Sequence, residues 1–146
     1  MKKNILIVDD EEIIISNLAI LIEDLYDEVF VAYNGLEALD LLLSNKEINL
    51  IVSDINMPIM DGVELIKKVR EHKLETPFIF FTAHGNDKLM LEAVKYGAYD
   101  FIDKPLFQDL EEVIEKGFEY SFKIKNGSQL DKEETISEYR KLLGDV

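Results

Sequence analysis

Several short apolar runs of this chain are followed directly by side chains that could do chemistry. In chain order these residues are Asp9, Asp10, Glu11, Asp54, Thr82 and Lys104. If the runs are parallel strands of one sheet, the residues that follow them gather at one edge, where open α/β sheets bind ligands. The edge would then hold acids, a hydroxyl and an ammonium group.

The carboxylates of such a group need a positive charge between them. Two carboxylates about 4 Å apart repel by about 4 kcal/mol at an effective dielectric constant of roughly 20. Lys104 does not balance three acids, so either their pKa values rise or a cation binds. A hard divalent cation fits best: Mg²⁺ accepts one or two carboxylates and phosphate oxygens while it keeps several waters, and Mn²⁺ could substitute for it.

An acid beside Mg²⁺, a hydroxyl and a lysine has the parts needed for phosphoryl transfer. Asp54 is the best candidate for the attacking carboxylate, because it stands alone at a strand end and Asn56 could offer its backbone carbonyl to the metal. The metal and Lys104 would neutralise the phosphoryl oxygens, and Thr82 would donate to one of them. The product would be an acyl phosphate.

Each of these residues also has an ordinary structural explanation. Asp9 or Asp10 could cap the helix that follows, and Asp54 could form an Asx-turn before "NMP". Thr82 could cap the next helix, and Lys104 could be a solvated loop residue. Their shared edge and their order along the chain favour a reactive site over a set of independent turn residues.

The elements that position these residues follow from the apolar pattern. Runs rich in β-branched or aromatic residues occur at 5–8, 29–32, 50–52, 78–81 and 101–102. Stripes of helical period follow them: Ile14, Ile15, Leu18, Leu21, Ile22 and Leu25; Leu36, Leu39, Leu42 and Leu43; Leu65, Ile66 and Val69; Leu89, Ala93 and Val94; Leu110, Val113, Ile114, Gly117 and Phe118. This alternation predicts a (βα)5 three-layer α/β sandwich around a parallel sheet.

Composition excludes several other classes of protein. Thirty acids and sixteen bases among 146 residues give a formal net charge of −14, which disfavours direct binding to nucleic acid or anionic lipid. The absence of cysteine excludes disulfides and thiolate chemistry. No stretch resembles a secretory signal or a membrane span, so we expect a cytoplasmic protein without membrane insertion.

The pattern changes near the end of the chain. We expect one domain at 1–123, followed at 124–146 by a polar turn and a short amphipathic helix in "ETISEYRKLLGDV". This C-terminal extension could pack on the domain, pair with another protomer in a homodimer, or begin a linker to an output domain.

Four stretches together resemble a known family. "ILIVDDEE", "LIVSDINMPIMDG", "FIFFTAH" and "GAYDFIDKP" are similar to the motifs of the response-regulator receiver domain, the phosphoacceptor half of two-component signalling. The resemblance covers about residues 3–122. It implies a flavodoxin-like fold with strand order 2-1-3-4-5, the order of the chemotaxis member of the family.

The resemblance also implies a metal site and a phosphoacceptor. Asp54 would be phosphorylated by the phosphohistidine of a histidine kinase or of a histidine phosphotransfer protein. Asp10, Asp54 and the backbone carbonyl of Asn56 would ligate Mg²⁺, and Asp9 would act through bound water. Lys104 would pair with the phosphoryl group.

Further residues take roles around that centre. Thr82 would be the switch hydroxyl and Phe101 the aromatic that follows it, although many members have a tyrosine with a phenolic hydroxyl there. Pro105 is similar to the proline that follows the family's lysine, usually after a cis bond. His84 and Asn56 would border the pocket and influence the lifetime of the phosphate.

The resemblance therefore predicts a signalling switch, not a turnover enzyme. Phosphorylation would change the surface of the fourth helix, fifth strand and fifth helix, around Lys95, Tyr96, Tyr99 and Phe101, to control an effector protein or a covalently linked output domain. One alternative is a degenerate receiver that binds partners without phosphorylation. An aspartyl-phosphate hydrolase is disfavoured because Asn56 stands where such enzymes usually have an acid, and a nucleotide-binding module because "DDEE" replaces a glycine-rich turn.

Overall fold

Strands and helices alternate along the chain. The computed structural model describes residues 2–44, 47–83 and 87–125. The elements are β1 (Asn4–Val8), α1 (Glu12–Ile22), β2 (Glu28–Ala32), α2 (Gly35–Ser44), β3 (Leu50–Ser53), α3 (Gly62–Glu71), β4 (Phe78–Thr82), α4 (Asp87–Lys95), β5 (Asp100–Asp103) and α5 (Phe107–Lys125). Each strand contains its predicted apolar run and extends it by one or two residues.

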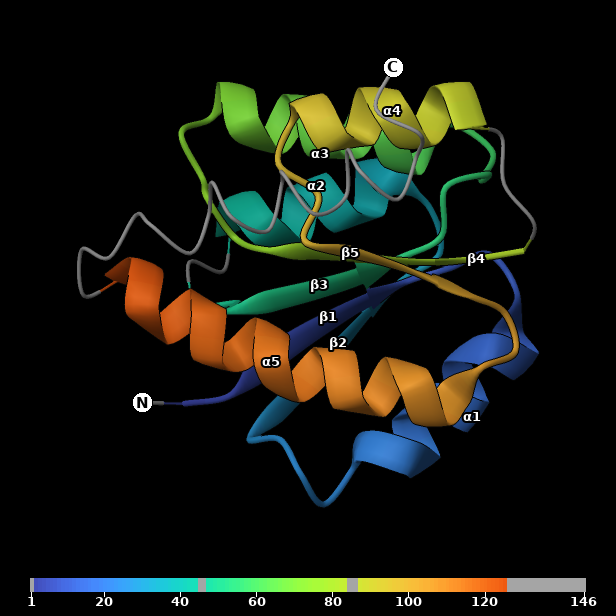
Figure 1. Cartoon of the computed structure of the whole chain (residues 1–146), viewed down its shortest axis with the longest axis vertical. Helices are drawn as coiled ribbons and strands as arrows, with labels where there is room; N and C mark the ends of the chain where they lie inside the picture. Colours follow the sequence, from blue (N-terminus) through green and yellow to red (C-terminus); the bar gives the residue numbers. More distant parts are fainter. Residues whose placement is uncertain (1, 45–46, 84–86, 126–146) are drawn as a thin grey trace.

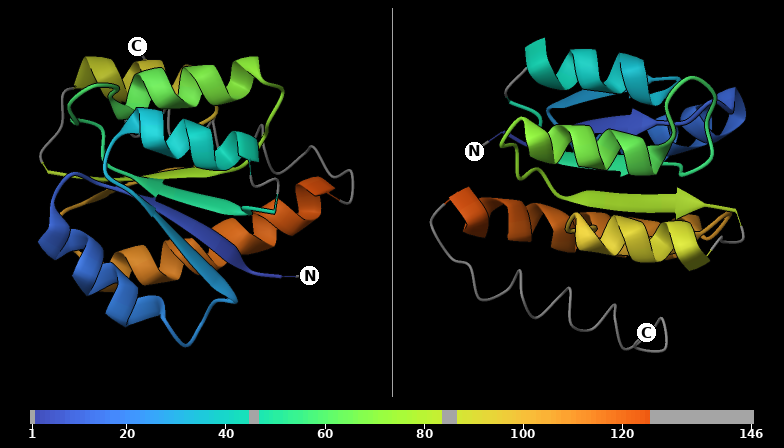
Figure 2. Two further views of the ribbon diagram at one scale, coloured as in Figure 1. Left: turned by 180° about the vertical axis from the view of Figure 1, so that it is seen from behind. Right: turned by 90° about the horizontal axis from the view of Figure 1, so that it is seen from above.

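The strands form one parallel sheet. Their order is β2-β1-β3-β4-β5, and every neighbouring pair is parallel. Helices α1 and α5 cover one face of the sheet, and α2, α3 and α4 cover the other (Figure 1). The view from behind shows the same three layers (Figure 2, left). The predicted flavodoxin-like sandwich with this strand order is confirmed.

The central strands supply both halves of the core. Residues of β1, β3 and β4 are buried throughout, and successive side chains point to opposite faces. Leu6, Ile51 and Phe80 pack toward α2, α3 and α4, whereas Ile7 and Val52 pack toward α1 and α5. These strands read as continuous apolar runs because both of their faces are covered by helices.

Three leucines of the predicted helical stripes do not face the core. Leu25 lies beyond the end of α1 and is exposed, and Leu36 and Leu43 are exposed on α2. Gly35, the first residue of α2, is instead in close contact with the connection between β3 and α3. Its N–H donates to the carbonyl of Met60 over 3.0 Å. A Cβ at Gly35 would lie 2.7 Å from that oxygen, so this contact requires glycine.

The last helix that the structure describes extends past the predicted domain boundary. Helix α5 continues to Lys125, two residues past position 123. The polar turn and amphipathic helix predicted for the rest of the chain lie outside the described residues, so the division into 1–123 and 124–146 stays a prediction. No helix within the described ranges is both long and apolar enough to cross a membrane.

Candidate functional site

The register of the sheet places Asp9 and Asp54 side by side. Val8 of β1 is level with Ser53 of β3, and the N–H of Asp54 donates to the carbonyl of Val8 over 2.9 Å. The next residue of each strand therefore emerges at the same level of the carboxyl edge. Asp9 is 2% exposed and Asp54 is 7% exposed. Two acids that are far apart in the sequence thus become buried neighbours.

Lys104 lies at the same edge of the sheet, directly after the end of β5. Thr82 of β4 is level with Asp103 of β5, and the N–H of Lys104 donates to the carbonyl of Thr82 over 2.9 Å. The Nζ of Lys104 lies 2.8 Å from Asp9 Oδ2, 2.9 Å from Asp54 Oδ2 and 2.9 Å from Glu11 Oε2. An ammonium group has three N–H donors, so each of them has one carboxylate partner.

The pKa values reflect this crowding of charge. Burial alone would lower the pKa of Lys104, but hydrogen bonds to Asp54, Asp9 and Glu11 outweigh it and raise the pKa above its ordinary value. Burial raises the pKa of Asp9, and the hydrogen bonds from Lys104 and from the backbone of Glu11 offset this only in part. Contact with Lys104 therefore does not fully offset the cost of burying the Asp9 carboxylate.

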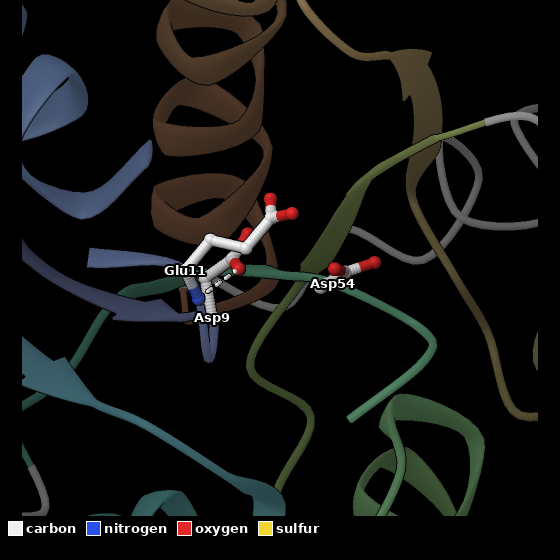
Figure 3. Close-up of side chains that lie close together, drawn as sticks. All are labelled: Asp9, Glu11 and Asp54. Atoms are coloured by element: carbon white, nitrogen blue, oxygen red, sulfur yellow. Dashed lines mark hydrogen bonds between the residues drawn. The ribbon is translucent and has the colours of Figure 1, made fainter. Parts of the chain in front are cut away.

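The three acids form a compact group of oxygen ligands. One carboxylate oxygen from each of Asp9, Glu11 and Asp54 lies within 4.8 Å of the others. Figure 3 shows Asp9 and Glu11 on the connection between β1 and α1 and Asp54 at the end of β3. Asp9 Oδ1 accepts the N–H of Glu11 over 2.9 Å, and Asp54 Oδ1 accepts the N–H of Ile55 over 2.7 Å. An all-oxygen donor set with excess negative charge fits a hard cation such as Mg²⁺.

Two of the predicted metal ligands lie outside this group. Asp10, for which the resemblance implies direct ligation, is exposed and is not part of the three-acid cluster found among the described residues. Asn56 is exposed two residues beyond Asp54. Asp9, for which the resemblance implies a contact through water, is the acid that faces Asp54. The ligation roles of all three residues stay predictions.

The residues with predicted switch roles lie on β4 and β5. Thr82 is 3% exposed, and its hydroxyl donates to the carbonyl of Ala83 over 3.2 Å. The half-buried ring of Phe101 stacks on Phe80, with ring centroids 5.5 Å apart. The Lys104–Pro105 peptide bond is cis. His84, which we expected at the pocket rim, lies outside the described residues.

Comparison with known proteins decides the family. The family model of the response regulator receiver domain matches residues 5–116. The chain belongs to this family. A receiver-domain relative, the chemotaxis protein CheY homolog of Campylobacter jejuni, is 38% identical over 99 residues, which are 63% of this chain and 76% of that protein. The transcriptional regulatory protein SrrA of Staphylococcus aureus is 40% identical over 105 residues, 72% of this chain and 43% of SrrA.

Solved structures of receiver domains have the same fold. The signal receiver domain of an HD domain-containing protein from Pseudomonas fluorescens Pf-5 superposes with a TM-score of 0.80 at 28% identity, covering 87% of this chain and 94% of that one. A CheY-like receiver domain protein from Methanospirillum hungatei has a TM-score of 0.77 at 30% identity, covering 84% and 98%. The resemblance inferred from the four motifs is confirmed.

Glu11 is the residue of this receiver domain that sequence reasoning placed at the edge without giving it a role. It precedes the first residue of α1 as the N-cap, but its side chain makes no capping hydrogen bond. Its carboxylate contacts Lys104 instead. A glutamate where Ser, Thr, Asp or Asn is preferred was the one signal in the sequence that could have drawn attention to it.

Proposed function

We propose that this receiver domain is a phosphoacceptor switch in which Asp54 takes a phosphoryl group in a Mg²⁺-dependent reaction. The observation that carries the proposal is the position of the Asp54 carboxylate. It is almost fully buried beside a second acid, and one of its oxygens accepts a hydrogen bond from Lys104. The carboxylate that we propose as nucleophile, the lysine that we propose as partner of the phosphoryl charge and acids that could hold a cation thus lie together at the carboxyl edge of the sheet.

The proposed reaction is a single displacement at phosphorus. One oxygen of Asp54 forms a bond to phosphorus, and the bond from phosphorus to the donor's nitrogen or oxygen breaks, so that the donor leaves with that electron pair. The N–H of Ile55 orients the carboxylate. Lys104 stabilises charge on the phosphoryl oxygens, and Thr82 donates its hydroxyl to one of them.

Mg²⁺, when bound, supplies further positive charge to the phosphoryl oxygens, and Mn²⁺ could substitute for it. The ligands proposed from the resemblance are Asp10, Asp54 and the backbone carbonyl of Asn56, with Asp9 acting through water. The oxygens of Asp9 and Glu11 near Asp54 support a cation site at this position.

Phosphorylation of Asp54 would change the surface formed by α4, β5 and α5. Thr82 and Lys104 are joined by a backbone hydrogen bond between β4 and β5, and Phe101 of β5 stacks on Phe80 of β4. Movement of Thr82 toward the phosphoryl group would change the packing of Phe101 and with it the exposed surface. The readout is a change in partner binding, with slow self-dephosphorylation in place of turnover.

The proposed partners are proteins. A histidine kinase or a histidine phosphotransfer protein would donate the phosphoryl group in the cytoplasm, and an effector protein or a linked output domain would read the switch. The named relatives, a chemotaxis protein and a transcriptional regulatory protein, support these two classes of output. We propose neither direct nucleic-acid binding nor membrane insertion by this domain. A homodimer would be seen as a doubled molecular mass in solution.

Incubation with acetyl phosphate and Mg²⁺ tests the proposal. We expect a phosphoryl adduct in the intact mass of the protein. The adduct should not form when a chelator is present from the start, nor in Asp54→Asn. Asp10→Asn then tests the proposed side-chain ligand separately, through the Mg²⁺ concentration needed for half-maximal phosphorylation. An adduct that forms equally well in Asp54→Asn contradicts the assignment, and a folded wild-type protein that forms none would favour a receiver that binds partners without phosphorylation.

A further inference from the structure

Glu11 has an unusual position at the start of α1. Its backbone is extended, with φ −93° and ψ 108°, and its carbonyl accepts the N–H groups of Ile14 and Ile15 in the first turn of the helix. The Asp9 carboxylate accepts the N–H of Glu11 and so fixes its backbone. The Glu11 side chain is therefore carried on a well-anchored backbone, and it makes an ion pair with Lys104 without capping the helix.

This ion pair uses the last N–H donor of Lys104. The other two donors are taken by Asp9 and Asp54, so none remains for a phosphoryl oxygen. Lys104 can stabilise a phosphoryl group on Asp54 only if one of its present partners gives way. The question is which carboxylate leaves.

The three partners of Lys104 differ in how readily they can be displaced. Asp54 is the reacting group itself. Asp9 has a side chain that is 3% exposed, and its second oxygen is held by a backbone N–H. The Glu11 side chain is 56% exposed and long, so water can replace Lys104 as its partner. Glu11 is the partner whose departure disturbs the site least.

We propose that Glu11 is a displaceable counter-ion of Lys104. It holds the ammonium group in the unphosphorylated site, and it must release one N–H donor before a phosphoryl oxygen can take its place. Glu11 then acts as a positioning residue that slows phosphorylation. It makes the unphosphorylated protein react more slowly with weak phosphoryl donors. This inference rests on the proposed function of Asp54.

A role for Glu11 as a metal ligand predicts the opposite result. Its oxygen belongs to the same cluster as those of Asp9 and Asp54. If Glu11 mainly held Mg²⁺, Glu11→Gln would raise the Mg²⁺ concentration needed for half-maximal phosphorylation and would slow the reaction. If Glu11 mainly competes for Lys104, the same substitution frees a donor and speeds the reaction at saturating Mg²⁺.

The first measurement compares Glu11→Gln with Glu12→Gln. Glu12 is the next residue, it is exposed, and it is not a partner of Lys104, so its substitution removes the same charge from the same region. With acetyl phosphate at saturating Mg²⁺, we expect the initial rate of Asp54 phosphorylation in Glu11→Gln to rise about two- to fivefold, the factor that corresponds to a half-exposed ion pair. Glu12→Gln should follow the wild type.

The second measurement uses metal-free protein. ¹⁵N relaxation of the Lys104 ammonium group should show greater mobility in Glu11→Gln than in wild type or Glu12→Gln, whether or not any phosphoryl donor is present. Unchanged mobility, slower phosphorylation of Glu11→Gln, or equal acceleration in both variants would overturn the proposal. If wild type is labelled on Asp54 but Glu11→Gln shows no difference, only this inference fails. If wild type is not labelled, the proposed function fails as well.

Discussion

Ionisation of the Asp9 carboxylate lowers the free energy of unfolding. Burial raises the pKa of this carboxyl despite its contact with Lys104. A carboxyl whose pKa is higher in the folded state binds its proton more tightly there, so the stability of the protein falls as the pH rises from 3.8 through the raised value. Asp9→Asn removes this ionisation.

We therefore expect metal-free Asp9→Asn to unfold at higher urea concentration than wild type at neutral pH, with a difference that shrinks as the pH is lowered toward the ordinary value of 3.8. Urea unfolding at several pH values with a chelator present measures this. Asp10→Asn, at the exposed neighbour, is the control. A gain in stability that does not change with pH would show that the effect is not electrostatic.

Ile59 has a backbone conformation that its side chain disfavours. Its φ is 72°, in the left-handed region where β-branched residues are rare, and the residue is 75% exposed. Asparagine tolerates this conformation better, so we expect Ile59→Asn to raise the free energy of unfolding by about 1 kcal/mol. Leu106→Asn removes a similar exposed side chain where φ is not positive, and it should give no such gain. Equal effects of the two substitutions on urea unfolding would contradict a backbone origin.

The residues of the site were predictable to different degrees. Asp9, Asp54 and Lys104 could be grouped from the sequence because each follows a recognisable strand and parallel strands end at one edge. Glu11 was placed at the same edge, but its role could not be predicted, since its contact with Lys104 depends on the backbone angles of the N-cap residue and on the choice of a partner outside the helix. Residues that leave a strand at its end are easier to place than residues in the turn that follows.

Gly62 fixes the connection between β3 and α3. A Cβ on this residue would lie 2.3 Å from the backbone carbonyl oxygen of Asp54 and 3.0 Å from the ring of Phe80. The backbone of Asp54 would have to move, so we expect Gly62→Ala to lower the free energy of unfolding by about 2–3 kcal/mol and to slow phosphorylation.

Gly117→Ala on α5 is the matched comparison for this glycine. The nearest atom to its added Cβ is the end of the Leu50 side chain at 2.9 Å, which can shift, and alanine favours the helix by about 1 kcal/mol. We expect stability close to wild type. Chemical denaturation of both variants measures the difference, and similar losses would mean that backbone crowding at Asp54 is not special.

Arg70 of α3 joins the connection between α3 and β4 to the connection between α4 and β5. Its guanidinium donates to the carbonyls of Leu74 and Thr76 and to that of Tyr96, all at 2.7–2.9 Å. Burial lowers the pKa of Arg70 to about 10, so the group remains charged at neutral pH. Arg70→Lys keeps the charge but cannot reach all these carbonyls.

We expect Arg70→Lys to lower the free energy of unfolding by about 2 kcal/mol, because several charge-assisted hydrogen bonds to partly buried carbonyls are lost. Hydrogen exchange should also increase at the turn that contains Tyr96. Lys67→Met on the exposed side of the same helix is the control. If exchange at that turn is unchanged in a destabilised Arg70→Lys, the arginine does not hold the connection in place.

At the scale of elements, strands were easier to predict than helix faces. The strand runs are apolar because two helical layers cover them, and this needs no knowledge of contacts. The face of α2 depends on how closely it approaches Met60, which requires Gly35 at the contact and leaves Leu36 and Leu43 outside. A stripe of leucines shows that a helix is present but not which of its residues touch the sheet.

Across the whole molecule, the net charge of −14 means that any salt stabilises the fold to some extent by screening repulsion. A bound divalent cation should do more, since it would sit among carboxylates that lie within 4.8 Å of one another. Binding to the folded state alone adds about 1.4 kcal/mol of stability when the metal concentration is ten times its dissociation constant.

We therefore expect MgCl₂ to raise the free energy of unfolding more than NaCl at equal ionic strength. The extra gain should disappear in Asp54→Asn, which loses a proposed ligand, and persist in Glu12→Gln, which changes the net charge by the same amount on the exposed surface. Urea unfolding of the three proteins in both salts separates binding at the site from screening. Asp54→Asn and Glu12→Gln have the same net charge, so screening alone cannot distinguish them. The same extra gain in Asp54→Asn as in wild type would therefore place the stabilising Mg²⁺ elsewhere on this acidic surface.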